Sequence, residues 1–145
     1  GLWVDYWTKE LQAGGRWVGV EAPLDVLPLW VRAGSIIPRG HDLAYAEQKA
    51  MNPLSLGVYY PQGVAPSVVH DEDRPSIPVG YRWQGDQLHV RVGAALDQVE
   101  VLLYGVPAAT AICNGQSLAL QRQGAGQLAR YGGTKAARLV FLLDS

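Results

Sequence analysis

Apolar residues recur at every second position along much of this chain, and this alternation constrains the fold more than any other feature. Leu88, Val90 and Val92, for example, alternate with His89 and Arg91. Successive side chains of a β-strand point to opposite faces, so each apolar set belongs on one face of a strand. Four further segments show the same period, at 54–60, 99–103, 118–120 and 139–143.

Turn residues separate these segments. Asn114-Gly115 is the strongest hairpin signal, because both residue types tolerate positive φ; the Gly14-Gly15 pair and residues 84–87 are also predicted turns. The 17 glycines and 9 prolines are spread along the chain, which argues against long helices. Only residues 44–50 have a helical composition, enough for one or two turns. Short strands at intervals of about 8–12 residues predict an all-β fold of antiparallel β-sandwiches.

Composition excludes several functional classes. With 12 Lys and Arg against 13 Asp and Glu, the chain lacks the basic footprint of a nucleic-acid-binding protein. No apolar run approaches the roughly 20 residues of a membrane-spanning helix, so we expect neither nucleic acid nor membrane as a partner. Cys113, the one cysteine, is expected to be a small buried apolar residue. The absence of an internal disulfide favours a reducing cytoplasm.

The first 38 residues contain a specific motif. Trp3, Asp5, Trp7 and Thr8 form W-x-D-x-W-T, and residues 22–38 have the sequence APLDVLPLWVRAGSIIP. This pattern resembles the segment that follows the catalytic (β/α)8 barrel in glycoside hydrolase family 31, the α-glucosidases, α-xylosidases and their relatives. Lys9 stands where the family most often has Gly.

A second block extends the resemblance. Residues 54–63 (LSLGVYYPQG) and 68–83 are similar to the family's distal C-terminal domain, with Asp71, Glu72 and Asp73 at its acidic turn. We favour a solvated turn over a calcium site there, because the spacing differs from that of an EF-hand loop. The resemblance implies an incomplete proximal β-domain at residues 1–53 and a distal β-sandwich at 54–145, with a boundary near Asn52-Pro53.

The resemblance also implies which functions are absent. In the family, two Asp residues on barrel loops catalyse retaining hydrolysis, which needs two carboxyl groups about 5–5.5 Å apart. Neither motif occurs here, so we expect no catalytic, cofactor-binding or metal-binding residue. His41, His70 and His89 lack metal-ligand spacing. The predicted function is a non-catalytic C-terminal module that packs against and supports the barrel of an enzyme that hydrolyses α-glycosidic bonds.

Site residues follow from the same motif. The residues expected at the interface with the barrel are Trp3, Trp7, Trp30, Arg32, Ser35, Ile36 and Ile37. Asp5 and Asp25 are expected to cap turns or to pair with Arg32 or Arg16. The alternative function is a stand-alone carbohydrate-binding β-sandwich, in which Trp17 and Trp83 are the candidate sugar contacts. A remnant of a broken gene is a third possibility.

In a chain without the barrel, the apolar residues of that contact would be partly exposed. This expectation covers Leu2, Trp3, Leu29, Trp30, Ile36 and Ile37. Because exposed apolar patches and open sheet edges favour pairing with another chain, we expect self-association through residues 1–38.

Overall fold

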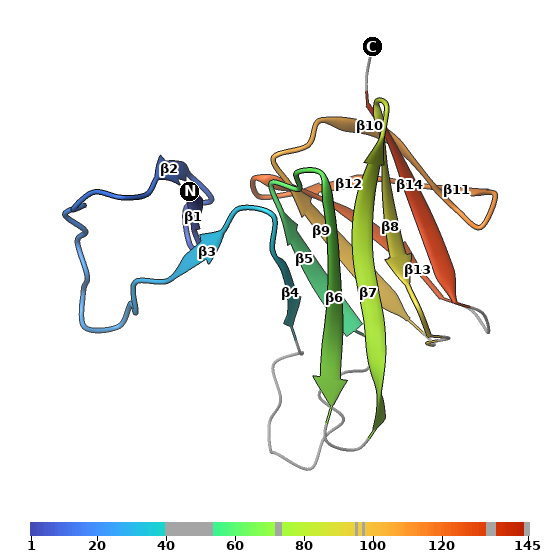
Figure 1. The fold of residues 1–145 in the computed structure, drawn as a ribbon, viewed down its shortest axis with the longest axis horizontal. Helices are drawn as coiled ribbons and strands as arrows, with labels where there is room; N and C mark the ends of the chain where they lie inside the picture. The colour runs from blue at the N-terminus through green and yellow to red at the C-terminus, as the bar shows by residue number, and fades with distance from the viewer. Residues whose placement is uncertain (40–53, 72–73, 95, 97, 133–135, 144–145) are drawn as a thin grey trace.

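The computed structural model describes residues 1–39, 54–71, 74–94, 96, 98–132 and 136–143, which form three β-sheets (Figure 1). The three-stranded sheet has the order β2-β1-β3, the six-stranded sheet β11-β10-β14-β8-β7-β6, and the five-stranded sheet β12-β13-β9-β5-β4. Their strands are β1 (Leu2–Asp5), β2 (Leu11–Ala13), β3 (Trp30–Arg32), β4 (Ile36–Arg39), β5 (Leu54–Tyr59), β6 (Val64–Asp71), β7 (Arg74–Gln84), β8 (Gln87–Val92), β9 (Val99–Tyr104), β10 (Ala108–Cys113), β11 (Gln116–Leu118), β12 (Gln121–Gln123), β13 (Gly126–Tyr131) and β14 (Ala137–Leu143).

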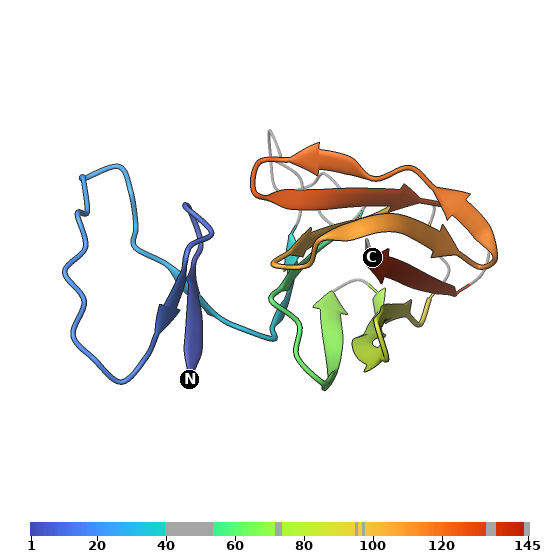
Figure 2. The ribbon, with the colours of Figure 1, turned by 90° about the horizontal axis from the view of Figure 1, so that it is seen from above.

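The six- and five-stranded sheets face each other as a sandwich, seen from its end in Figure 2. The predicted all-β sandwich is therefore confirmed. Neighbouring strands are antiparallel except for β5 and β9, which run parallel with Leu54 opposite Val99. The described residues contain no helix, and the segment 44–50, predicted to hold at most two helical turns, lies outside them.

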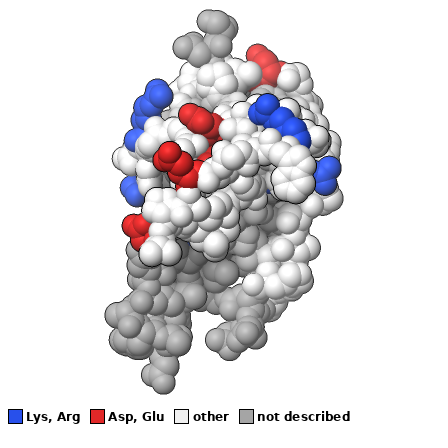
Figure 3. All heavy atoms as spheres, turned by 90° about the vertical axis from the view of Figure 1, so that its left-hand side faces the viewer, with Lys and Arg blue, Asp and Glu red and all other residues white. Residues whose placement is uncertain are grey.

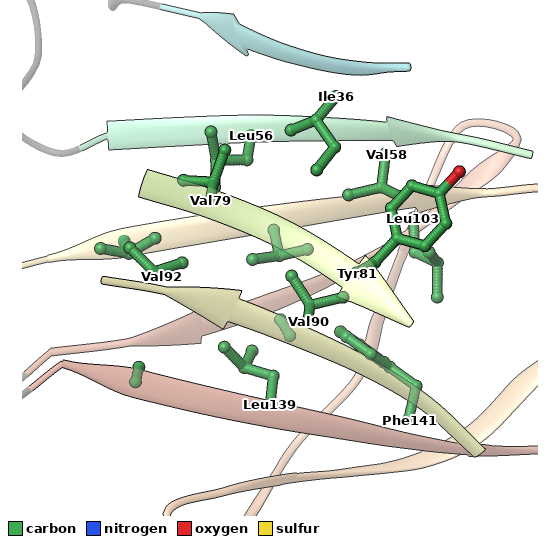
Figure 4. Close-up of a cluster of buried hydrophobic side chains, with 14 of the residues drawn as sticks. Ile36, Leu56, Val58, Val79, Tyr81, Val90, Val92, Leu103, Leu139 and Phe141 are labelled. Carbon is green, nitrogen blue, oxygen red and sulfur yellow. The ribbon is translucent and has the colours of Figure 1, made fainter. Parts of the chain in front are cut away.

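The main core fills the space between these two sheets (Figure 4). Leu88, Val90 and Val92 of β8 are fully buried, whereas His89 is half-buried and Arg91 is exposed, as the alternation predicts. Cys113 is also buried, which confirms its predicted role as a small apolar residue.

A second, smaller core lies between the three-stranded sheet and the outer face of the five-stranded sheet. Val4 and Val31 contribute to it from the first sheet. The opposing residues on β5, β9 and β13 are Tyr59, Leu102, Tyr104 and Leu128. Every residue of β5 is consequently buried, because this strand is covered on both faces.

Two of the three predicted turns form hairpins, and the third does not. Asn114 (φ 48°) and Gly115 (φ 85°) adopt the left-handed conformation between β10 and β11, and Gly85 (φ 64°) turns β7 into β8, so these two hairpins are confirmed. The turn predicted at Gly14-Gly15 makes no hairpin, because residues 17–20 form no strand to pair with β2.

The predicted domain boundary near Asn52-Pro53 lies outside the described residues. Upstream of it, β4 pairs with β5 and thus joins the five-stranded sheet, with Ile36 opposite Val58. A tight turn connects β3 to β4, in which the Ser35 amide donates to the Arg32 carbonyl at 3.1 Å. Gly34 has φ 94° in this turn, a conformation that favours glycine.

Candidate interaction surface

Exposed large apolar side chains gather in the first 29 residues. Two others, Val64 and Val68, lie on β6. In Figure 3 the N-terminal segment faces the viewer. Most of the described surface in this view carries neither Lys or Arg nor Asp or Glu. The residues of this apolar surface are Leu2, Trp3, Trp7, Leu11, Trp17, Val18, Val20, Leu24, Leu27 and Leu29.

The segment 14–29 produces much of this exposure. It leaves β2, runs without strand structure away from the sandwich, and returns at β3 (Figure 2). The relative exposures of Trp17 and Leu24 are 103% and 111%, so their side chains have essentially no intramolecular contact. Surfaces of this kind are uncommon on monomeric soluble proteins and mark interaction sites.

Three predicted interface residues share the outward face of the three-stranded sheet. Because Val4 pairs with Val31 and both point to the second core, the alternate residues Trp3, Trp30 and Arg32 point away from it. Trp3 lies directly opposite Arg32 in the register. The two-residue period of the strands thus places the indoles of Trp3 and Trp30 and the guanidinium of Arg32 on one face of the sheet.

Trp3 and Trp30 also line a hollow of about 230 Å³. The register places Gln12 of β2 directly opposite Trp3. The hollow therefore combines aromatic faces with hydrogen-bonding groups, the composition found in many ligand sites. Its remaining lining residues are Ala13, Gly14, Gly15, Arg16 and Val18.

The carboxylate of Asp5 organises the turn that follows β1. Its Oδ1 accepts hydrogen bonds from the amides of Trp7 (2.8 Å) and Thr8 (3.0 Å), which confirms the predicted capping role. The Trp7 indole N–H donates to the Leu27 carbonyl at 2.8 Å and ties the turn to segment 14–29. Asp25 is exposed in that segment.

The partial exposure predicted for six apolar residues is confirmed for all but Ile36. Leu2, Trp3 and Leu29 are exposed, and Trp30, Ser35 and Ile37 are half-buried. Ile36 was predicted to be partly exposed in a chain without the barrel, and this is wrong: it is 8% exposed and belongs to the main core. The cause is the pairing of β4 with β5, which turns Ile36 toward the opposite sheet (Figure 4).

The two tryptophans proposed as sugar contacts lie in different surroundings. Trp17 is fully exposed on segment 14–29. Trp83 is packed partly against the main core, and its indole N–H donates to the Pro61 carbonyl at 2.9 Å. The structure therefore does not bring these two side chains together.

Lys9 contacts three tyrosine rings, an interaction that the sequence did not predict. Its φ of 65° is left-handed, and its ammonium group lies over the rings of Tyr6 (4.2 Å), Tyr104 (5.0 Å) and Tyr59 (5.5 Å), measured to the ring centroids. Burial lowers the pKa of Lys9, as does the charge of Arg39, while Asp5 opposes the shift. The only signal available in the sequence was the replacement of the family's Gly by Lys.

The described residues contain no group of three or more His, Cys, Asp or Glu side chains that could hold a metal ion. Burial raises the pKa of the Cys113 thiol. No helix in the described part of the chain is long and apolar enough to span a membrane. The acidic turn around Glu72 lies outside that part.

The fold and this surface define a class: an all-β region with one extensively exposed apolar side. Residues 1–37 match the family model of the glycosyl hydrolase family 31 C-terminal domain. The chain is therefore related to the C-terminal region of family 31 glycoside hydrolases, and the resemblance predicted from its sequence is confirmed.

Curated relatives agree with this assignment. The chain is 34% identical over 74 residues to alpha-glucosidase 2 of Bacillus thermoamyloliquefaciens, covering 50% of this chain and 9% of the relative. It is 47% identical over 58 residues to the alpha-xylosidase of Saccharolobus solfataricus, covering 39% of this chain and 8% of the relative. The matched part of the chain thus spans less than a tenth of the length of either protein.

Solved structures share the fold over almost the whole chain. The GH31 dextranase of Flavobacterium johnsoniae has a TM-score of 0.80 at 15% identity, over 98% of this chain and 23% of the dextranase chain. The cycloalternan-forming enzyme of Listeria monocytogenes has a TM-score of 0.79 at 19% identity, over 99% and 16% of the respective chains. At these identities the likeness shows the fold alone.

Proposed function

We propose that this chain is a non-catalytic C-terminal module of a family 31 α-glycosidase, and that its apolar surface packs against the (β/α)8 barrel. The observation that carries the proposal is the gathering of exposed apolar side chains in residues 1–29, the segment that also matches the family model. Trp3, Trp30 and Arg32 on the outward sheet face, with Trp7 on the adjoining turn, are the proposed contact residues.

Burial of the exposed apolar side chains would stabilise this contact. An interface with another domain covers apolar area at a gain of roughly 25 cal/mol per Å². Aromatic and Arg side chains are enriched at interface centres, since they combine large contact area with polar groups. In a chain without the barrel, the same surface would favour self-association. The enzyme's hydrolysis of α-glycosidic bonds would be carried out by carboxylates of the barrel.

Two measurements test this proposal. An immunoblot of source cells should show a native polypeptide several times larger than the 15.7 kDa of this chain. The isolated chain should leave aryl α-glucosides and α-xylosides intact. A native band at 15.7 kDa would contradict packing against a barrel in the same polypeptide, and enzyme-like hydrolysis by the chain would contradict the non-catalytic role.

Variants of the larger polypeptide would locate the contact. Trp30→Ser should lower its thermal midpoint, because removing the indole loses buried area at the proposed interface. Val64→Ser is the matched control, since Val64 is 67% exposed on β6, in the six-stranded sheet. Equal midpoints for the two variants would contradict a contact at Trp30.

A stand-alone carbohydrate-binding module is the second candidate, and the hollow lined by Trp3, Trp30, Gln12 and Arg16 favours it. Pyranose rings stack on indole faces while amide and guanidinium groups bond to hydroxyls. Titrating maltooligosaccharides and xyloglucan fragments while following Trp fluorescence tests this function, with Trp3→Ala as the site variant and Trp83→Phe as the control. No saturable change at millimolar sugar would exclude it.

A further inference from the structure

A basic groove lies on the outer face of the six-stranded sheet, on strands β6, β7, β8 and β14, whose outer face is turned toward the viewer in Figure 1. Tyr81, Val90 and Leu139 point inward to the main core. Because strand side chains alternate, Arg82, His89, Arg91 and Arg138 point outward.

The strand register brings these four side chains together. Arg82 lies directly opposite His89, and Arg91 lies directly opposite Arg138. Directly paired residues of an antiparallel sheet have Cβ atoms about 4.5–5.5 Å apart. Three arginines on three neighbouring strands thus share one face of the sheet with His89 and line the same groove.

Gly80 creates the space beside them. It lies opposite both Pro66 on β6 and Arg91 on β8, and it leaves the sheet surface without a side chain at its position. The resulting groove has a volume of about 240 Å³, and Val64 and Pro66 line its β6 side. A water molecule takes about 30 Å³, so the groove has room for a group of several non-hydrogen atoms.

Like charges directly opposite each other destabilise a sheet, so this arrangement has an energetic cost. None of the three arginines forms an ion pair with a described carboxylate; the described ion pair of the chain, Arg130–Glu100, lies on the five-stranded sheet. Burial lowers the pKa of His89, and the charges of Arg138 and Arg82 lower it further. The Nδ1 atom of His89 is buried without a hydrogen-bond partner in the described structure.

We propose that this groove binds a small oxyanion, a phosphate, sulfate or carboxylate group, through Arg82, Arg91 and Arg138. Guanidinium groups suit these ligands because their planar N–H donors match pairs of oxygen atoms. An oxyanion in the groove would neutralise the repulsion among the three arginines. None of the residues that line the groove belongs to residues 1–29, and the proposal does not depend on the function proposed above.

Calorimetric titration of the purified chain with inorganic phosphate, sulfate and acetate tests this site. We expect saturable binding with one site per chain. The order of the three dissociation constants distinguishes a site for tetrahedral oxyanions from a site for carboxylates. Arg91→Gln and Arg138→Gln should each weaken binding by about 10-fold or more, since a charge-assisted bond is lost. Arg122→Gln, an exposed arginine on β12 in the other sheet, should bind like the wild type.

The imidazole gives an independent readout. A bound anion should raise the pKa of His89, followed by its NMR resonances, because it offsets the charges of Arg138 and Arg82. The β6 residues at the groove, Val64 and Pro66, do not titrate. Binding that is unsaturable, or equally weakened by Arg122→Gln, would overturn the proposal. Unchanged affinity in both Arg91→Gln and Arg138→Gln would also overturn it, because the two guanidinium groups would then make no contact with the anion.

Discussion

The ammonium nitrogen of Lys9 lies 5.0 Å from the centre of the Tyr104 ring, so the turn after β1 contacts the outer face of the five-stranded sheet. The same ammonium group donates a hydrogen bond to the Tyr6 carbonyl. In return, the Tyr60 hydroxyl donates to the Lys9 carbonyl at 3.3 Å. A single left-handed residue therefore connects the three-stranded sheet to β5 and β9.

Replacing Lys9 by Met should destabilise the chain by about 1–2 kcal/mol, because a part-desolvated cation–π contact is lost while the left-handed strain remains. Lys9→Gly should fall between Met and wild type, since it removes the strain together with the contact. Urea unfolding measures these differences, and Arg16→Met on the exposed segment is the matched control. A Lys9→Met chain as stable as the wild type would show that the aromatic contact contributes nothing.

Tyr59→Phe should leave stability unchanged or raise it by up to about 1 kcal/mol at neutral pH. The Tyr59 hydroxyl is buried without a hydrogen-bond partner in the described structure, so its removal ends a desolvation cost. A loss of more than 1 kcal/mol in urea unfolding at pH 7 would contradict this explanation.

The same residue should make stability depend on alkaline pH. Burial, with the nearby Tyr104 and Tyr6, raises the pKa of Tyr59 from 10 to about 12. The unfolded chain then releases this proton first, so this group leaves the free energy of unfolding independent of pH below pH 10 and lowers it as the pH rises to 12. Unfolding free energies at pH 9 and 11.5 should differ less in Tyr59→Phe than in wild type. Burial also raises the pKa values of Tyr104 and Tyr131, so a smaller dependence should persist.

Gly34→Ala should destabilise the β3–β4 turn by about 1–2 kcal/mol. Its φ of 94° is strained for any residue with a Cβ, and that atom would lie 3.1 Å from the Tyr81 hydroxyl. Tyr81→Phe is the companion variant: it loses the hydroxyl's 2.9 Å hydrogen bond to the Gly34 carbonyl, for about 1 kcal/mol. The two losses should not add in the double variant, which thermal unfolding can check.

Leu24→Ser with Leu27→Ser should reduce self-association of the isolated chain. Their side chains are 111% and 68% exposed, so the change removes apolar surface without touching either core. Sedimentation velocity over a range of concentrations measures the effect, and Val64→Ser on β6 is the control. A strictly monomeric wild-type chain at high concentration would contradict the premise.

The sequence alone predicted the strands whose two faces differ in polarity. In β8 the apolar residues alternate with His89 and Arg91, and the structure follows that pattern. Period two does not decide between Ile36 and Ile37, because both are apolar, and only the pairing of β4 with β5 selects Ile36 for the main core.

Contacts between strands that lie far apart in the sequence could not be predicted either, because the residues of a strand do not specify its partner. Tyr59 and Tyr104 stack with their ring centroids 4.8 Å apart, but nothing in either segment indicates the parallel pairing of β5 and β9. The outward direction of Arg91 was evident from the alternation. Its position opposite Arg138 depends on the register of β14 against β8, which the sequence pattern leaves open.

The parallel pairing of β5 with β9 has a consequence for synthesis. Residues 54–59 leave the ribosome about 45 residues before their partner 99–104, a delay that follows from the register of the pair. Leu102, Tyr104 and Leu128 must all have emerged before Val4 and Val31 have a surface to pack on. During that interval the first segment of the chain is available to chaperones, so its docking is a late step that depends on residues 102–128.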